Sequence, residues 1–305
     1  MSHQGPDMRR ALRNTGLLAA GMATMLAFGA TTVSAAAPAS KVAYLNARGA
    51  GHGQSQHAKP GPGAKSPLLL WHNGEILQST AVESIFWGTT WASGAGDKIT
   101  GLDRFYTGVG GTAYMQTNTE YKGTNGQVGA AVSYGGHVSD NSAGPTNAPS
   151  TTTILAEVAR ALAANHVTPV ANGYYPVYVD LPRGNAGYCA WHSYGTIGNV
   201  PVQFGFFFKL DSDPGCDPGD SVTGHSQALA ALANVSGHEL SETVTDPRNG
   251  GWYDRSGAEN SDKCAWTFGS TVTIGGEQWK IQGNWSNAAY NARSGYDHAG
   301  CIQTS

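Results

Sequence analysis

Apolar residues along the chain follow two patterns: short runs rich in β-branched and aromatic side chains, and longer segments with helical spacing. Between residues 150 and 166, apolar side chains recur at helical spacing behind Ser150 or Thr151, either of which can cap the first turn. The β-branched and aromatic runs predict strands. Helices are expected over 97–109, 150–166 and about 222–244, and strands over 68–77, 81–91, 127–136, 174–182 and 200–210.

The order of these elements limits the fold class. Strands and helices alternate, but without the regular spacing of a doubly wound parallel sheet. Near the carboxyl end, residues 270–283 form two short apolar runs around Gly275-Gly276, which predicts a hairpin. We therefore expect an α+β fold in which helices pack on a mixed β-sheet and disulfide-stapled loops carry the functional site.

The amino-terminal region has the pattern of an export signal. Three Arg residues precede an apolar run over 17–30, and Val33-Ser34-Ala35 fits a small-x-small cleavage site. The run is shorter than the roughly 20 residues that a membrane-spanning helix needs. We predict a signal peptide over 1–35, a flexible segment rich in Gly, Pro, Ser and Ala over 36–66, and a single domain over 67–305. The chain is thus expected to be secreted, without integral membrane association.

Charge and composition narrow the range of partners. The chain has 18 Lys and Arg against 21 Asp and Glu. Residues 1–35 contain three Arg and one Asp, so the remainder carries a net charge of about −5. No basic stripe occurs, and nucleic acid is therefore not an expected partner. We expect the protein to be a monomer that acts on an extracellular peptide or cell-wall substrate.

The chain has four cysteines, an even number that indicates two disulfides in an exported protein. Among the three possible pairings we predict the one between sequence neighbours, Cys189 with Cys216 and Cys264 with Cys301. A zinc site built from cysteines is the competing interpretation, but no Cys-x-x-Cys spacing occurs in the chain.

The segment GHELSETVTDP, residues 237–247, carries the strongest chemical signal. On a helix, residues four apart share a face, so His238 and Glu242 are placed to hold one metal ion, with Glu239 a quarter-turn away. Zinc hydrolases with His-Glu-x-x-His use this spacing, and their Glu takes a proton from the metal-bound water. Here Glu242 stands at the second ligand position, where it would bind through oxygen. The alternative is a solvated helix face.

A catalytic zinc site needs a third protein ligand. Glu259 and Asp262 follow far enough along the chain for it to fold back onto the helix, and His192 is another candidate. His72 is a weaker one. The sequence does not choose among them.

Other residues near the motif have structural interpretations. Gly237 in mid-helix costs about 1 kcal/mol relative to Ala, so its missing side chain indicates close approach by another segment. Asp246 is expected to cap the turn before Pro247. His225 cannot bind the same ion unless the helix breaks, because thirteen residues at 100° place it about 220° around the helix from His238.

Several motifs together resemble a known family. They occur in order as WHNGEIL (71–77), CAWH (189–192), GCDPG (215–219), GHELSETVTDP (237–247), WYD (252–254) and AENSDKC (258–264). The set resembles the phosphate-induced protein 1 / EXORDIUM family, secreted proteins of the cell-wall space best known from plants, with bacterial relatives. The chain departs from the family pattern at Asp246 and in CAWH, and its Ala-rich signal indicates a bacterial member. The resemblance implies motif roles, but no reaction, for His72, His192, His238, Glu239, Glu242, Glu259, Asp262 and Cys264.

Two functions from different classes stay open. The first is a secreted metal-dependent hydrolase of the zinc metallopeptidase type with a zincin-like active-site helix. In it, His238, Glu242 and one of the candidate third ligands hold Zn²⁺. Glu239 is the general base, and Tyr253 or a remaining His steadies the oxyanion. Oxygen-rich ligation also tolerates Mn²⁺ or Ca²⁺.

The second is a non-catalytic secreted protein in which the same residues form a structural ion site or a polar cluster. Its aromatic residues would then bind cell-wall glycan, although Trp at strand positions usually belongs to the core. The Trp residues considered are Trp87, Trp91, Trp252, Trp266, Trp279 and Trp285.

Overall fold

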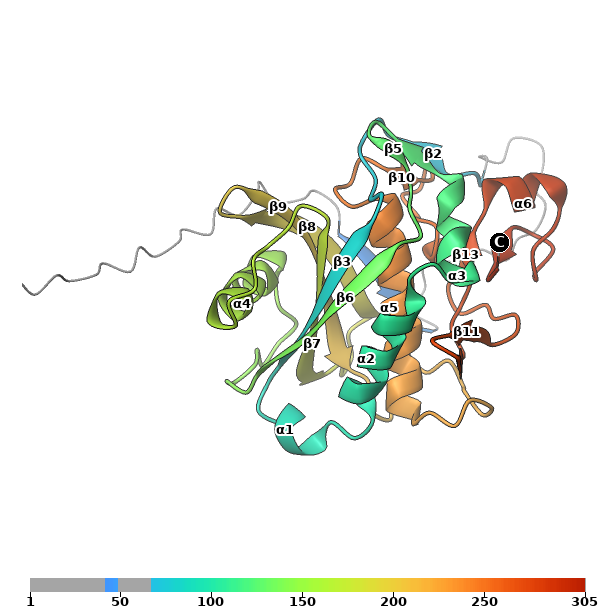
Figure 1. Cartoon of the computed structure of the whole chain (residues 1–305). Coiled ribbons are helices and arrows are strands. Elements are labelled where there is room, and N and C mark those ends of the chain that lie inside the picture. The colour runs from blue at the N-terminus through green and yellow to red at the C-terminus, as the bar shows by residue number, and fades with distance from the viewer. Residues whose placement is uncertain (1–41, 49–66, 305) are drawn as a thin grey trace, which may run out of the picture. The chain divides into compact units, whose positions relative to one another are not determined.

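A mixed β-sheet of six strands forms the centre of the protein (Figure 1). The computed structural model describes residues 42–48 and 67–304, all within one compact unit. The sheet order is β1-β8-β9-β7-β3-β6. Strands β6, β3, β7 and β9 are parallel to one another, whereas β8 pairs antiparallel with β9, and β1 pairs antiparallel with β8. The strands are β1 (Ala43–Asn46), β3 (Thr80–Trp87), β6 (Val132–Asp140), β7 (Gly173–Pro182), β8 (Tyr188–Ile197) and β9 (Val200–Lys209).

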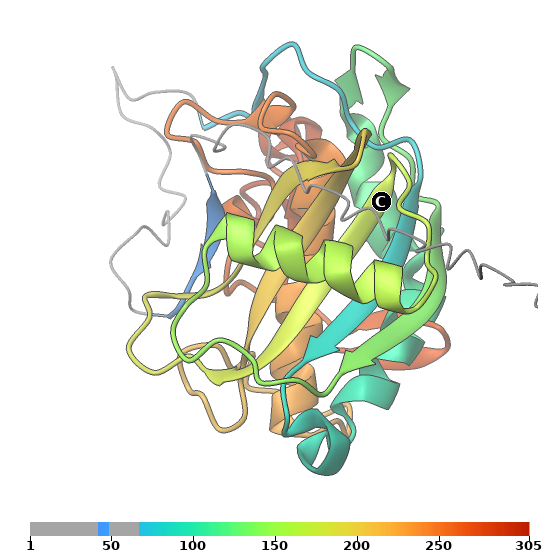
Figure 2. The same ribbon diagram turned by 90° about the vertical axis from the view of Figure 1, so that its left-hand side faces the viewer.

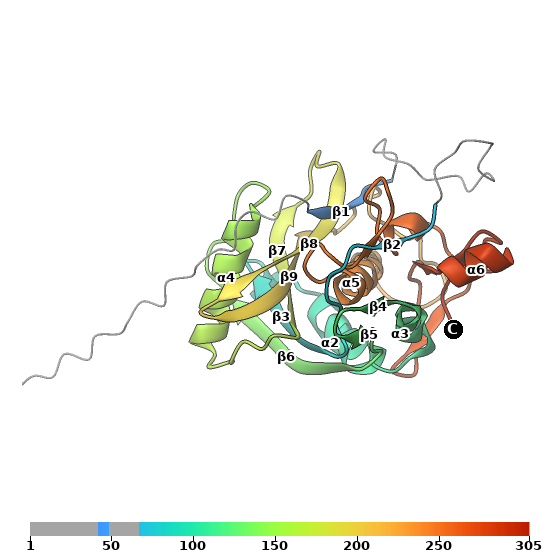
Figure 3. The same ribbon diagram turned by 90° about the horizontal axis from the view of Figure 1, so that it is seen from above.

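Helices cover both faces of the sheet, so the fold has three layers (Figures 2 and 3). Helix α4 (Thr151–Ala164) packs on one face, and α2 (Lys98–Val109) and α5 (Gln227–Thr245) pack on the other. Helix α5 also contacts α2 and the carboxyl-terminal strand β12 (Glu277–Trp279). Every residue of α5 from Leu229 to Thr245 is therefore buried.

Local sequence explains where the two long helices begin and end. Ser150 Oγ accepts the Thr153 N–H at 3.2 Å, which confirms the predicted cap of α4. Ser226 caps α5 in the same way, through the Leu229 N–H at 3.1 Å. The helix thus begins five residues later than predicted, because the Ser226 hydroxyl ends the preceding loop.

The remaining elements are short. The predicted hairpin is confirmed, with Gly275 and Gly276 at φ of 59° and 83°, a region that suits glycine. The short helices are α1 (Trp91–Gly94), α3 (Ala113–Gln116), α6 (Asn287–Ala292), η1 (Thr117–Glu120) and η2 (Asp262–Cys264). The paired short strands are β2 (Leu70–Trp71) with β10 (Trp252–Tyr253), β4 (Lys122–Gly123) with β5 (Gly126–Gln127), β11 (Val272–Ile274) with β12, and β13 (Asn284–Trp285) with β14 (Cys301–Ile302).

Several predictions about the amino-terminal half need correction. The strand expected over 81–91 ends at Trp87, and the one expected over 127–136 is β6, which runs from Val132 to Asp140. The flexible segment expected over 36–66 is wrong at Ala43–Asn46, which forms β1 because it pairs with β8 and buries Leu45. Of the strand expected over 68–77, only Leu70–Trp71 forms a strand. The side chains of Leu69, Ile76 and Leu77 are buried in the core, but their backbone is not part of a sheet. The predicted signal peptide over 1–35 lies outside the described residues. Among the described helices, none is long and apolar enough to cross a membrane.

Both predicted disulfides are confirmed. Cys189–Cys216 joins the start of β8 to the loop after β9, and Cys264–Cys301 joins η2 to β14. Each bridge lies within three residues of a predicted metal ligand, because His192 follows Cys189 and Asp262 precedes Cys264.

Loss of either disulfide should lower the free energy of unfolding by about 3.5–4 kcal/mol, since each closes a loop with a sequence separation of 27 or 37 residues. The comparison is denaturant unfolding of the Cys189→Ala/Cys216→Ala and Cys264→Ala/Cys301→Ala variants against the oxidised wild type. A loss below about 1 kcal/mol in both would contradict this origin of the stability.

Candidate metal centre

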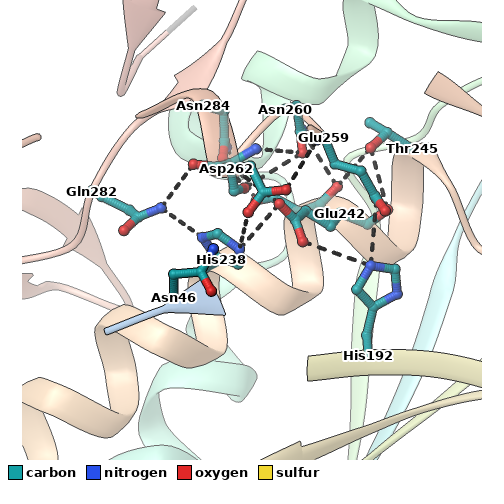
Figure 4. Close-up of polar contacts among 12 residues, drawn as sticks. Asn46, His192, His238, Glu242, Thr245, Glu259, Asn260, Asp262, Gln282 and Asn284 are labelled. Atoms are coloured by element: carbon teal, nitrogen blue, oxygen red, sulfur yellow. Dashed lines mark hydrogen bonds and ion pairs between the residues drawn. The ribbon is translucent and has the colours of Figure 1, made fainter. Parts of the chain in front are cut away.

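Carboxylates and imidazoles from three segments meet beside α5 (Figure 4). The helix supplies His238, Glu239 and Glu242, all buried, so the alternative of a solvated helix face is wrong. Two groups of three possible ligands share Glu242, and within each the ligand atoms lie within 4.8 Å of one another. The groups are His238, Glu242 and Asp262, and His192, Glu239 and Glu242.

The distances around Glu242 match those between ligands of one ion. His238 Nε2 lies 3.0 Å from Glu242 Oε1 and 3.7 Å from Asp262 Oδ1. On the other side, His192 Nε2 lies 3.6 Å from Glu242 Oε2 and 3.4 Å from Glu259 Oε2. Two ligands bound about 2.1 Å from a tetrahedral ion stand about 3.4 Å apart. The geometry therefore fits a divalent cation, whose identity it does not specify.

Several atoms in this cluster are buried without a hydrogen bond. They are Nε2 of His192, Nε2 of His238 and both carboxylate oxygens of Glu239. His238 Nε2 is near Glu242, but their alignment is not that of a hydrogen bond. Native proteins rarely leave buried polar atoms unsatisfied. An ion in the group of His238, Glu242 and Asp262 would satisfy His238 Nε2, and an ion in the group of His192, Glu239 and Glu242 would satisfy His192 Nε2 and a Glu239 oxygen.

Burial also sets the protonation of the two imidazoles. It lowers the pKa of His192 to about 3, with a smaller contribution from His238. It lowers the pKa of His238 to about 4, although the Asp262 carboxylate acts in the opposite direction. Both rings are therefore neutral at pH 7, as metal ligation requires.

The Glu239 carboxyl group has the opposite shift. Burial raises its pKa well above the ordinary value, and the negative charges of Glu242 and Asp262 raise it further. The Leu45 backbone N–H faces the carboxylate and acts to lower the pKa, but it lies outside hydrogen-bond geometry. A cation in the cluster would offset the carboxylate repulsion.

Gln282 sets the tautomer of His238. Its Nε2 lies 2.7 Å from His238 Nδ1 and donates to the Ser261 carbonyl, while its Oε1 accepts the Trp266 N–H. With the carboxamide in this orientation His238 Nδ1 would accept a hydrogen bond and the ring proton would belong on Nε2. Metal binding at Nε2 requires that the proton move to Nδ1 and that the Gln282 carboxamide turn over.

The supporting polar residues include two that sequence reasoning did not select. Asn234 Oδ1 accepts the Gln282 backbone N–H at 2.8 Å, which fixes the segment carrying that side chain. Asn234 stands four residues before His238 on the same helical ridge, so its spacing was a usable signal. Gln282 had no comparable signal, because only the tertiary fold brings it to the helix. The Asp262 backbone N–H also donates to Glu242 Oε1 at 2.9 Å, which orients that carboxylate.

The geometry bears on the third ligand that the sequence left open. Asp262 joins His238 and Glu242, whereas His192 joins Glu242 in the group that uses Glu239 as a ligand. Glu259 contacts His192 but belongs to neither group. The first group leaves Glu239 available for proton transfer.

Tyr253 and His72 lie outside both ligand groups. Their rings stack with centroids 3.4 Å apart, and His72 Nε2 lies 3.0 Å from the Tyr253 carbonyl oxygen. Burial raises the pKa of Tyr253, and Asp246 and Glu259 add to this effect, so the phenol lies within electrostatic reach of the cluster. The oxyanion role predicted for Tyr253 stays a prediction.

The structural interpretations near the motif hold in part. A Cβ on Gly237 would lie 3.1 Å from the Tyr114 hydroxyl oxygen and 3.6 Å from a Phe105 ring carbon, which agrees with the predicted close approach. Asp246 caps the turn after Pro247 instead of the one before it, because its Oδ1 accepts the Gly250 and Gly251 N–H groups. His225 precedes α5, and its ring contacts Thr223 and Trp279 instead of the cluster.

Comparison of the chain with protein-family models, with curated proteins and with solved structures finds no match. The resemblance to the phosphate-induced protein 1 / EXORDIUM family therefore stays a prediction.

Metal loading should move the His238 proton from Nε2 to Nδ1, because Nε2 faces the carboxylates that would share the ion. Imidazole ¹⁵N NMR of metal-free and zinc-loaded protein measures this change directly. An unchanged Nε2–H tautomer in zinc-loaded protein would exclude Nε2 as the coordinating atom.

Glu242→Gln should weaken metal binding more than Glu259→Gln, because Glu242 belongs to both ligand groups and Glu259 to neither. The isosteric amide keeps the volume and removes the charge. We expect a loss of affinity of at least 100-fold for Glu242→Gln, against roughly 10-fold for Glu259→Gln, typical of a residue that only orients a ligand. Titration with Zn²⁺ against a competing chelator measures the affinity of each variant. Equal losses of affinity in the two variants would contradict the role of Glu242 as a metal ligand.

Proposed function

We propose that the chain is a secreted, metal-dependent hydrolase of the metallopeptidase type. The observation that carries the proposal is the group of His238, Glu242 and Asp262 beside the unbonded carboxylate of Glu239. His238, Glu242 and Asp262 would hold a divalent cation, which would supply Lewis acidity and lower the pKa of a water molecule. Glu239, one position after His238, would take a proton from the attacking water.

The arrangement of elements supports a zincin-like interpretation of α5. The helix lies against the mixed sheet and presents two ligands one turn apart, and Asp262 returns from the following segment. The strand β8, antiparallel in the sheet, brings His192 to the same place. Two disulfides next to the site support export, since such bonds persist in oxidising compartments.

The donor set also indicates how the enzyme would differ from one with two His ligands on the helix. Glu242 and Asp262 bring two negative charges to the ion, which makes a bound water less acidic. Hydrolysis should therefore be slower, and Mn²⁺ or Ca²⁺ can compete with Zn²⁺ for the oxygen-rich site.

A non-catalytic protein with a structural ion is the second candidate. It is favoured by the burial of the cluster, since Asp262 is the most exposed member of its ligand group, at 20% of its side chain. The glycan-binding part of this alternative has less support. Trp87 and Trp252 are half-buried, and four of the six Trp residues are in the core: Trp91, Trp266, Trp279 and Trp285.

Three variants test the hydrolase. His238→Ala should lose most bound metal, whereas Glu239→Gln should keep it and slow any peptide hydrolysis by about 10²–10⁴-fold, the usual contribution of a general base. Glu277→Gln, on β12 outside both ligand groups, is the matched control and should change neither. Elemental analysis and cleavage of a quenched fluorescent peptide library give the two readouts. Negligible metal in the wild type, unchanged in His238→Ala, would refute the proposal.

A further inference from the structure

Strand β1 lies directly against the candidate metal centre. Its register places Ala43 opposite His192 of β8, and the Leu45 backbone N–H faces the Glu239 carboxylate. β1 contacts α5 as well as β8, and Figure 3 shows the strand beside both. The side chain of Leu45 is completely buried. This short segment therefore covers the catalytic helix at the residue proposed as general base.

The segment is held on both sides. Beside β8, the Ala47 N–H donates to the Gly187 carbonyl at 2.9 Å. On the other side, the Asn46 carbonyl accepts the Trp266 indole N–H at 2.7 Å, and the Arg48 guanidinium lies over the Trp266 ring. Residues 42–48 thus lie between the edge of β8 and the segment that follows Asp262 and Cys264.

The contacts of β1 are those of a peptide bound to a sheet edge. Without it, β8 is the edge strand and exposes backbone N–H and C=O groups that an extended chain can pair with. Leu45 supplies the kind of buried side chain that anchors such a peptide, and Tyr44 points outward with 41% of its surface exposed. The pairing is also imperfect, with a register shift between Leu45 and Asn46.

We propose that β1 is an internal occupant of the substrate cleft, that it keeps the hydrolase closed, and that the substrate is an extended polypeptide pairing antiparallel with β8 in its place. The identity of the substrate rests on the proposed function. The occlusion rests on the contacts of β1 alone. Displacement of β1 would uncover the β8 edge and the Glu239 carboxylate that the Leu45 N–H faces.

The first test separates β1 from the domain without removing it. A protease recognition sequence is inserted between residues 56 and 57, and the cleaved protein is diluted so that the amino-terminal fragment dissociates. Hydrogen exchange of the β8 amides should then rise at least tenfold, and zinc extraction by a chelator should speed up by a similar factor. A synthetic peptide of residues 42–48 should reverse both effects, while a scrambled peptide should reverse neither.

Point variants supply a second test in the uncut chain. Leu45→Ala weakens the anchor of β1 and should speed zinc extraction at least tenfold. Leu162→Ala truncates an equally buried Leu on α4, on the opposite face of the sheet, and is the matched control. Equal acceleration in the two variants would mean general loss of stability and would overturn the proposal.

The outcomes separate this inference from the proposed function. If the wild type binds no metal, the hydrolase is refuted, while β8 exchange and peptide reversal still decide whether β1 is a displaceable occupant. If metal is bound but release of β1 changes neither the hydrogen exchange of β8 nor the rate of zinc extraction, the proposal that β1 blocks the site is overturned. The metal site is then unaffected by this result. Activation of peptide hydrolysis on cleavage, abolished by Glu239→Gln, supports both.

Discussion

The burial of several carboxyl groups around one point on α5 is the constraint on which the rest of the structure depends. Glu239, Glu242 and Glu259 are almost completely buried and Asp262 is mostly so, and two neutral imidazoles lie among them. Moving an ionised carboxylate out of water costs several kcal/mol unless a partner or a proton compensates. Protonation can neutralise one member, and the raised pKa of Glu239 shows that tendency. A divalent cation shared by His238, Glu242 and Asp262 would neutralise the cluster more completely and would satisfy the ring nitrogen of His238 as well.

The scaffold fixes this cluster from several independent directions. Each disulfide ends within three residues of a ligand candidate, one beside His192 and the other beside Asp262. Asn234 and Gln282 connect the ligand helix to the carboxyl-terminal region through buried hydrogen bonds. Because strand, helix and loop are each fixed by separate contacts, the side chains lie close together without an ion, and an ion would not have to assemble the site. Such preorganisation favours a tight and selective site over one assembled by the metal.

The sequence predicted the site better than the sheet around it. The spacing of His238 and Glu242 is a local property of one helix and could be read directly. Four cysteines allow three pairings, and the one between sequence neighbours is the one observed. β8 was missed because its apolar residues are interrupted by polar ones and it exists through pairing with β9 and β1. β1 was also missed, because it lies in a segment whose composition resembles a linker and it forms a strand only by pairing with β8. The role of Gln282 could not be foreseen, because 44 residues separate it from the imidazole it contacts.

Access to the cluster decides between the two functional classes. A structural ion site can be completely buried, whereas the site of a hydrolase must be reached by a peptide carbonyl group close to Glu239. The described residues that cover this carboxylate include β1, which reaches the centre from a part of the chain far from the motif. A cover made of one short edge strand is among the easiest parts of a fold to displace, because few buried contacts oppose its local opening. The cluster can therefore be deeply buried and still belong to an enzyme, provided that β1 leaves before the core of the sheet unfolds.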